Sequence, residues 1–235
     1  MSEHKNIKFY ATQPHQCSYL PDEEATTLFI DPDITTDQAL CSNLSNLGFR
    51  RSGQHLYRPH CNQCNACIAS RIPATDFSMR RTQRKVWSRN SDLKVEKRTP
   101  EYCHEHYDLY EQYINQCHHD GDMYPATVEQ YSAFLIDNPG FTSFYEFRLQ
   151  GELLAVSVVD ELQNAFSAIY TYYSPKYSNR SLGKYCILWL IHQAKQQQID
   201  YVHLGYWIKN SQKMNYKIEF RPIELYINQQ WQLLK

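Results

Sequence analysis

The chain has 235 residues, which is enough for one large domain or for a medium domain with a small attachment. Its 24 Lys and Arg residues balance 25 Asp and Glu residues to a formal net charge of −1, which excludes nucleic-acid binding through bulk charge and leaves only local basic patches. The N-terminus lacks an apolar export segment and no run approaches the roughly 18 apolar residues of a membrane span, so we expect a cytosolic (cytoplasmic) protein with no membrane partner.

The first 75 residues are loop-rich in composition. They hold five prolines and five of the eight cysteines, and they show little helical periodicity. One helix is expected among them, because Leu40, Leu44 and Leu47 share a face. Thr36 can cap its start, and Gly48 stands where a helix usually ends. We therefore predict a small Cys-containing N-terminal domain over residues 1–75 and a second domain over residues 76–235.

Two helices are expected early in the second domain. Thr99 and Pro100 stand in the cap and first positions of a helix that would keep one apolar face as far as Cys117. Another helix would begin at Thr127, because Gln130 completes a capping box there.

Strands dominate the next part of the second domain. Runs at 141–149, 153–159 and 165–173 are separated by short turns, which predicts an antiparallel meander. A glycine-bearing turn at 180–185 then leads into a helix and into a strand at 201–205. This order of elements resembles the acyltransferase fold of the GCN5-related N-acetyltransferases (GNAT). The predicted fold class is therefore α+β, with a GNAT-like acyltransferase domain.

Three cysteines in the N-terminal segment have the spacing of metal ligands. Cys61, Cys64 and Cys67 lie at intervals of three residues, so that one turn can present all three sulfurs to a single ion. The candidates for a fourth ligand are, in order, Cys17, Cys41, His60 and His55. In a reducing compartment such thiols persist as free thiols or as metal ligands rather than as disulfides. Zinc and an iron–sulfur cluster both accept four thiolates, so a structural site for either stays open beside three free cysteines.

Two basic runs are candidates for binding RNA phosphates. The first places five positive charges beside Trp87, at Arg80, Arg81, Arg84, Lys85 and Arg89. The second repeats lysine every four residues, at Lys209, Lys213 and Lys217, which is one face if the segment is helical. The alternative for each run is a solvated surface.

Further chemistry is indicated at three places. Gly183 stands in a turn before a helix, where free N–H groups and a missing side chain let a phosphate or an adenosine approach. His118 lies among carboxylates at a helix end, where a base or a substrate clamp is expected, or else an exposed polar loop. Asp160 ends an apolar strand, where a carboxylate needs either a structural partner or a catalytic function.

Taken together, these motifs resemble the arginyl/leucyl-tRNA–protein transferase family, and within it the bacterial leucyl branch. The segments that carry the resemblance are CSYLP at 17–21, GFRRSG at 48–53, YRPHCNQCNAC at 57–67, RTQRK at 81–85, HHDGDM at 118–123, YTYYSP at 170–175, SLG at 181–183, LGYWI at 204–208 and KMNYK at 213–217. The family implies a GNAT-like transferase domain, a cysteine-bearing N-terminal region and a charged tRNA as donor. Cys117 departs from the pattern, because an arginine is expected before the histidine.

The resemblance implies transfer of leucine from leucyl-tRNA to the N-terminal α-amine of proteins that begin with Asp or Glu, which targets them for degradation. The donor ester is already activated, so the chemistry requires no cofactor and mainly needs placement. Asp160 is the first candidate for the base and His118 the second, while Tyr170 or backbone N–H groups would stabilise the oxyanion. The candidates to bind the acidic first residue are Arg81, Arg84 and His118. Further candidates for contacts to the substrates are Gly183, Tyr206, Lys213 and Lys217.

Three other functions stay open. An arginyl-tRNA–protein transferase would differ only in its donor, although the short chain and the cysteine triplet favour the leucyl branch. An acetyl-CoA-dependent N-acetyltransferase would share the fold but needs no grip on RNA. A non-catalytic zinc module that binds RNA would explain the cysteines and the basic runs and would leave the second domain without a purpose.

Overall fold

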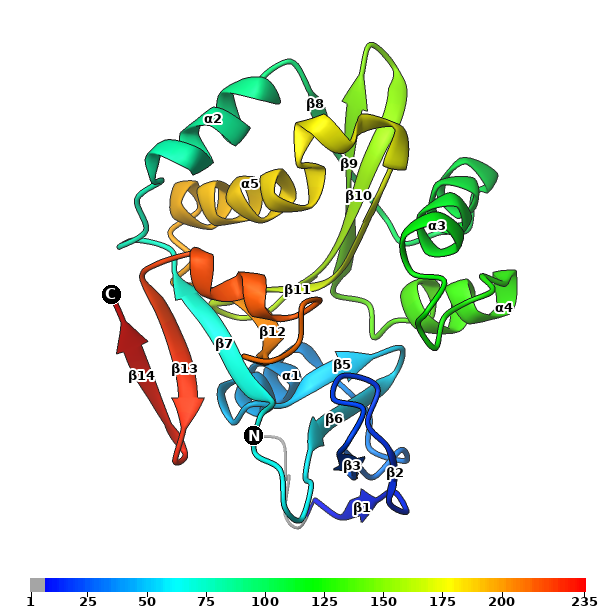
Figure 1. Ribbon diagram of the computed structural model, residues 1–235, viewed down its shortest axis with the longest axis vertical. Helices are drawn as coiled ribbons and strands as arrows, with labels where there is room; N and C mark the ends of the chain where they lie inside the picture. The colour runs from blue at the N-terminus through cyan, green and yellow to red at the C-terminus, as the bar shows by residue number, and fades with distance from the viewer. Residues whose placement is uncertain (1–6) are drawn as a thin grey trace.

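The computed structural model of the protein describes residues 7–235 (Figure 1). Its main element is an eight-stranded sheet with the strand order β14-β13-β7-β12-β11-β10-β9-β8. These strands are β7 (Ile68–Pro73), β8 (Lys94–Arg98), β9 (Thr142–Leu149), β10 (Glu152–Glu161), β11 (Ala165–Tyr173), β12 (Tyr201–Trp207), β13 (Ile223–Ile227) and β14 (Gln230–Leu234). The smaller sheets contain β1 (Phe9–Ala11), β4 (Thr27–Ile30), β6 (His55–Pro59) and β5 (Arg50–Ser52) in one, and β2 (His15–Gln16) and β3 (Glu24–Ala25) in the other.

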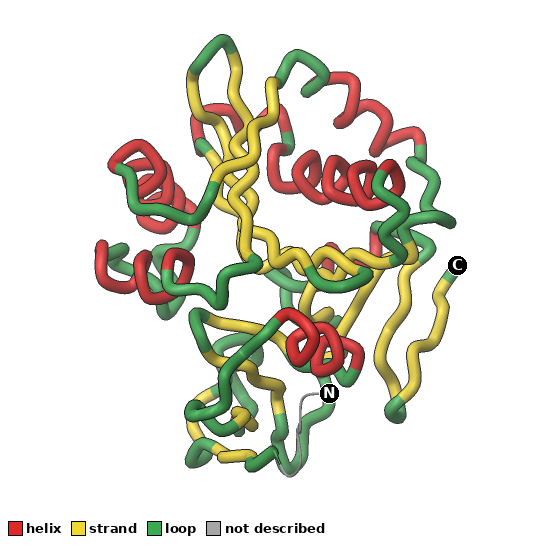
Figure 2. The backbone as a smooth tube through the Cα atoms, turned by 180° about the vertical axis from the view of Figure 1, so that it is seen from behind, coloured by secondary structure: helices red, strands yellow, loops and turns green. Residues whose placement is uncertain are grey.

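Helices cover both faces of the large sheet at its β8–β11 end, with α2 and α5 on one side and α3 and α4 on the other (Figures 1 and 2). The helices are α1 (Gln38–Asn46), α2 (Arg81–Arg89), α3 (His104–Cys117), α4 (Val128–Tyr131), the π-helical η1 (Ser132–Ile136), the 3₁₀-helical η2 (Pro175–Arg180), α5 (Leu182–Gln196) and the 3₁₀-helical η3 (Asn215–Glu219). Alternation along β9 sends Phe147 into the core under α5 and Phe144 into the core under α3. No helix in residues 7–235 is long and apolar enough to cross a membrane.

The predicted meander and its crossover are confirmed, and so is the α+β fold class. β9, β10 and β11 pair in antiparallel order, and α5 then carries the chain to β12, which runs parallel to β11. The pairing of β10 with β11 shifts by one residue between Val158 and Val159. The shift lies opposite Ala168 and Tyr170 of β11, which line the cavity described below.

Two predicted helix starts differ from the structure. The helix expected from Thr99 begins at His104, because β8 continues to pair with β9 as far as Arg98 and the chain needs several residues to reach the other face. The helix expected from Thr36 is capped one residue later, by the side chain of Asp37, which accepts a hydrogen bond from Leu40 N at 2.7 Å. The start at Thr127 is confirmed, since its hydroxyl accepts from Gln130 N at 3.2 Å.

The N-terminal segment contains more strand than its composition indicated. β1, β4, β5 and β6 form a sheet of their own, whereas β7 pairs with β12 and β13 inside the large sheet. Short strands with many polar residues leave no clear alternation for a sequence reader. The division at residue 75 stays a prediction, and its first six residues lie outside the described part of the chain.

Candidate active site

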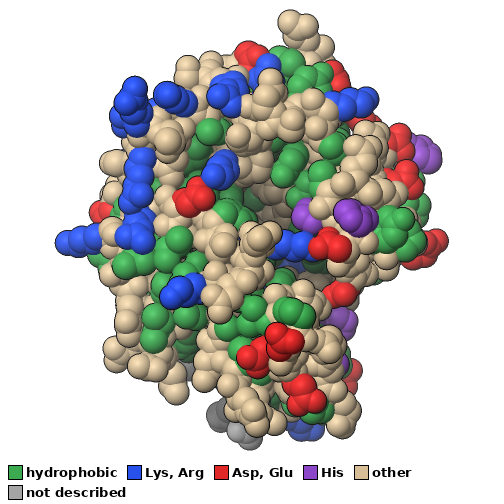
Figure 3. Space-filling model, in the orientation of Figure 1, with side chains coloured by type: hydrophobic (Ala, Val, Ile, Leu, Met, Phe, Trp, Pro, Cys, Tyr) green, Lys and Arg blue, Asp and Glu red, His purple; other side chains and the backbone are tan. Residues whose placement is uncertain are grey.

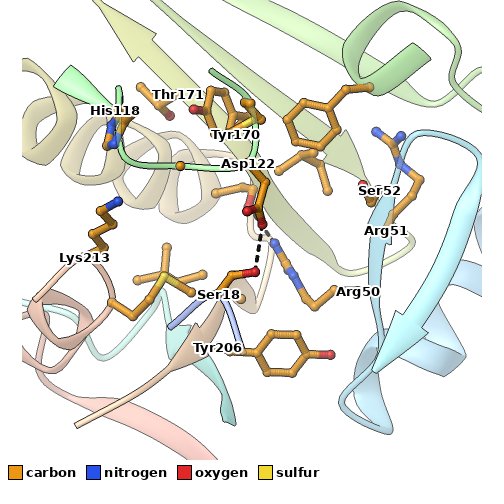
Figure 4. A pocket seen from close by; sticks show the side chains of 18 of the residues that line it. Ser18, Arg50, Arg51, Ser52, His118, Asp122, Tyr170, Thr171, Tyr206 and Lys213 are labelled. Atoms are coloured by element: carbon orange, nitrogen blue, oxygen red, sulfur yellow. Dashed lines mark hydrogen bonds between the residues drawn. The ribbon is translucent and has the colours of Figure 1, made fainter. Parts of the chain in front are cut away.

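A cavity of about 1420 Å³ opens between the N-terminal segment and the second half of the chain. Figure 3 shows it as a hollow near the centre of the drawn face, with His and with Lys or Arg side chains at its rim. Its walls come from the loop before β3, from β5 and β6, from the loop after α3, from β11, from the start of α5, from β12 and from η3. Figure 4 shows side chains from these segments pointing into one space.

Arg50 on β5 provides a buried positive charge in this cavity. Its side chain donates to Ser167 Oγ at 2.9 Å and to the carbonyl oxygen of Ala168 at 2.6 Å, and the residue is only 7% exposed. Gly205 on β12 lies against this side chain, where an added Cβ would be in van der Waals contact with Arg50 Nε at 3.4 Å, and its φ of +78° is in the left-handed region that favours glycine. Arg50 therefore donates to neutral acceptors, and no carboxylate of residues 7–235 forms an ion pair with it.

Lys217 in η3 provides a second buried cation, with an exposure of 4%. Its Nζ lies 3.2 Å from Met214 Sδ and 4.9 Å from the centre of the Tyr216 ring, which are weak partners for an ammonium. Burial, followed by the positive charge of Arg50, lowers the pKa of Lys217 to about 7. The structure does not make the 209–217 segment one helical face, since Lys213 instead reaches Asp120 and is partly exposed.

Aromatic side chains from α3, η1 and β11 form another wall of the cavity. Tyr113 and Tyr173 pack with ring centres 4.7 Å apart, and Phe134 contacts Tyr170. Burial raises the pKa of Tyr170, so its hydroxyl stays protonated at neutral pH and can donate a hydrogen bond. Gly183 at the start of α5 lets the Tyr173 ring approach, because a Cβ there would lie 3.0 Å from that ring.

Polar contacts between loops surround the mouth. Ser18 Oγ donates to Asp122 Oδ2 at 2.7 Å (Figure 4), and Lys213 Nζ pairs with Asp120 Oδ1 at 2.7 Å. His118 lines the cavity beside them. Burial, together with the charge of Lys213, lowers the pKa of His118 below its ordinary value of 6.5, so the imidazole is neutral at pH 7 and can accept a proton.

Asp160 lies outside the cavity lining and has both of its oxygens bound. Arg51 Nε donates to Oδ2 and Arg51 Nη2 to Oδ1, each at 2.7 Å, and the Thr142 hydroxyl donates to Oδ1 at 2.7 Å. Both side chains of the ion pair are 2% exposed. This geometry matches a structural pair, in which the carboxylate has a partner rather than a free lone pair for a substrate.

The remaining predicted contacts are divided between the cavity and the surface. Tyr206 lines the cavity and donates to the carbonyl oxygen of Gly48 at 2.9 Å. Arg81 and Arg84 lie on α2, which packs on α5, and neither lines the cavity. Arg84 donates to the carbonyl oxygen of Met79 at 2.7 Å and leaves its charge exposed.

The four predicted metal ligands are neighbours in the structure. Burial raises the pKa of Cys67 to about 12, and the thiolates of Cys17, Cys61 and Cys64 add to that rise, so each of the three lies within electrostatic range of Cys67. Cys17 was the first candidate for the fourth ligand, and it lies in this group. Within residues 7–235, however, no three His, Cys, Asp or Glu side chains converge closely enough to hold an ion.

The sequence analysis missed Arg50 and undervalued the burial of Lys217. Both stand in segments that carried the family resemblance, GFRRSG and KMNYK. Two adjacent arginines on a strand point to opposite faces of the strand, so both cannot pair with the same carboxylate. That pattern was the available signal for two separate roles.

The chain matches two family models, described as "Arginine-tRNA-protein transferase, N terminus" over residues 15–85 and "Arginine-tRNA-protein transferase, C terminus" over residues 105–227. It is 57% identical over 231 residues to a protein of Pseudomonas entomophila named aspartate/glutamate leucyltransferase, with 98% of each chain covered. It is 55% identical over 234 residues to the protein of that name in Pseudomonas fluorescens, with 100% of each covered. A solved structure, L-PGS from Bacillus licheniformis, is similar at 12% identity and a TM-score of 0.48, with 61% of this chain and 47% of that chain covered.

Proposed function

Because the chain belongs to the arginine-tRNA-protein transferase family, we propose that it transfers leucine from leucyl-tRNA to the N-terminal α-amine of proteins that begin with Asp or Glu. The observation that carries this function is the identity of 55–57% to leucyltransferases over almost the whole of both chains. Proteins so extended would be marked for degradation in the cytosol. The meander, the glycine-bearing turn and the parallel crossover support a GNAT-like transferase domain.

Transfer consists of attack by the neutral α-amine on the ester carbon of leucyl-tRNA. The new bond is an amide, the ester C–O bond breaks, and the 3′-terminal hydroxyl of the tRNA leaves. An α-amine has a pKa of about 7.7–8.0, so much of it is neutral near pH 7.5 and a weak base can accept the proton that the nitrogen loses. Placement in the cavity supplies most of the rate enhancement.

His118 is our choice for the group that accepts this proton, and Tyr170 for the donor to the oxyanion. A neutral imidazole at the cavity wall supports the first role, and a protonated phenol in the same cavity supports the second. Asp160 is less suited to accept a proton, since Arg51 and Thr142 already bind its oxygens.

The tRNA would be held by the exposed positive charges of α2, including Arg81 and Arg84, and by Lys213 at the mouth. The cavity would hold only the 3′ end of the tRNA and the leucine attached to it. The aromatic wall of Tyr113, Tyr170 and Tyr173 offers apolar surface for a leucine side chain.

A structural zinc ion or iron–sulfur cluster would be held by Cys17, Cys61, Cys64 and Cys67. Four thiolates are the donor set that either group accepts, and the four side chains, which do not converge within residues 7–235, would have to close around it. The group would stabilise the loop that carries Ser18 and Tyr19 to the cavity and would take no part in the transfer.

A transfer assay tests the function directly. Purified protein is mixed with leucyl-tRNA, arginyl-tRNA or acetyl-CoA and with peptides that differ only in a first residue of Asp, Glu, Asn or Gln. We expect leucine to be transferred from leucyl-tRNA to the peptides that begin with Asp or Glu. The other pairs of donor and peptide should hardly react. Equal transfer to Asp and Asn peptides, or acetylation without tRNA, would overturn the proposal.

A further inference from the structure

The floor of the cavity holds two positive charges that no carboxylate neutralises within the described residues. Arg50 and Lys217 are 7% and 4% exposed, and both line the cavity. The positive charge of Arg50 helps to lower the pKa of Lys217, and both residues line the same cavity. A buried cation without a counter-ion costs free energy, which a fold tolerates where a ligand supplies the missing anion.

The other charged groups that line the cavity form no ion pair with Arg50 or Lys217 among the described residues. Lys213 is paired with Asp120, Lys184 is paired with Glu219, Asp122 accepts from the Ser18 hydroxyl, and Asp137 also lines the cavity. The titratable groups beside the two cations are the phenols of Tyr57, Tyr173, Tyr206 and Tyr216, whose pKa burial raises, and the ion pair of Arg51 with Asp160. The phenols stay neutral and the carboxylate of Asp160 is paired with Arg51, so neither Arg50 nor Lys217 has a carboxylate of its own among the described residues.

We propose that Arg50 and Lys217 form the subsite for the side-chain carboxylate of the acceptor's first residue, and that Lys217 determines the preference for Asp and Glu over Asn and Gln. This inference rests on the proposed function. The first residue of the acceptor must enter the cavity, because its α-amine attacks there. A carboxylate on a short side chain is a compact anion that can reach a buried pair of cations, and arginine with lysine offers donors from two sides.

The pair also predicts how the preference varies with pH. An acceptor carboxylate is ionised at every pH above about 5, whereas Lys217 loses its proton as the pH rises through about 7. The ratio of kcat/KM for an Asp peptide to that for an Asn peptide is the suitable measure, because ionisation of the α-amine and any effect on the tRNA cancel in it. This ratio should fall by about tenfold between about pH 6 and about pH 8.5 in the natural protein.

Lys217→Met tests the proposal, since methionine has a similar length and fits beside Met214 and Tyr216. We expect the variant to lower the Asp-to-Asn ratio by about tenfold or more at pH 6 and to make the ratio independent of pH. Lys184→Met is the matched control, because this lysine also lines the cavity but has Glu219 as its partner. The control should keep both the ratio and its pH dependence.

The outcomes separate the inference from the proposed function. If the natural protein transfers leucine to neither peptide, the function itself is wrong. If the natural protein prefers Asp but Lys217→Met keeps the natural ratio, the subsite is elsewhere and the inference is wrong. An equal loss of kcat for both peptides would make Lys217 a group in the chemistry, and an equal rise in KM for leucyl-tRNA would assign it to an RNA phosphate; either result overturns the inference.

Discussion

Arg50 and Arg51 are adjacent on one short strand, yet they belong to two different regions of the molecule. Arg51 is locked against Asp160 and Thr142 in a buried network whose hydrogen bonds are satisfied. Arg50 faces the cavity with Lys217 and has no anionic partner among the described residues. The first region joins β5 to β9 and β10, while the second keeps its charge available for a ligand. Neighbouring residues of a strand thus divide stability and binding between the two faces of the strand.

The largest effect is expected from Asp160→Asn, which breaks the paired region. The buried Arg51 would lose its counter-ion, and we expect the free energy of unfolding to fall by about 3–5 kcal/mol. Denaturant unfolding measures this loss, with Glu219→Gln as a control at an exposed pair that should change stability by about 0.5 kcal/mol or less.

The same variant separates the two candidate bases. Folded Asp160→Asn should retain most of its kcat, whereas His118→Asn should keep its stability and lose about 100-fold in kcat. The assignment of His118 fails if its variant turns over normally while folded Asp160→Asn does not.

A smaller effect, of opposite sign, is expected from Lys217→Met in the unpaired region. The pKa of Lys217 is about 7 in the folded chain and near its ordinary 10.5 in the unfolded chain, so the unfolded chain binds more protons between these values. The stability of the natural protein should therefore rise with pH from about 7 to about 10.5, and removal of the amine should abolish that rise. At pH 7 we therefore expect the variant to be more stable than the natural protein. A destabilised variant with an unchanged pH slope would show that Lys217 has a partner after all.

The smallest effect is expected from Gly205→Ala, which adds a methyl group in contact with the Arg50 side chain. The residue has a φ of +78°, and the left-handed region costs alanine about 1–2 kcal/mol. Gly140→Ala is a matched control, since Gly140 has a φ of +89° and no atom within 4 Å of an added Cβ. Both variants should lose similar stability, but only Gly205→Ala should reduce the Asp-to-Asn ratio. Equal ratios would mean that Arg50 tolerates the displacement.

Local patterns in the sequence were sufficient for much of the fold. The meander from β9 to β11, the crossover through α5 and the capped start of α4 follow from alternation, turn residues and capping, which depend on near neighbours in the chain. The motifs that indicated the family were also local, and the family matches over 15–85 and 105–227 agree with them.

The tertiary structure alone decided which charges are paired. Asp160 was an attractive base in the sequence, but its partner Arg51 is 109 residues away. Lys213 and Lys217 look equivalent in the chain, yet Lys213 meets Asp120 at the mouth while Lys217 is buried on weak partners. The free energy of a charge depends on its burial and on nearby charges, and both are set by long-range contacts that no local pattern records. The sequence by itself therefore determined the elements and the family, whereas the fold determined which cations remain free for a substrate.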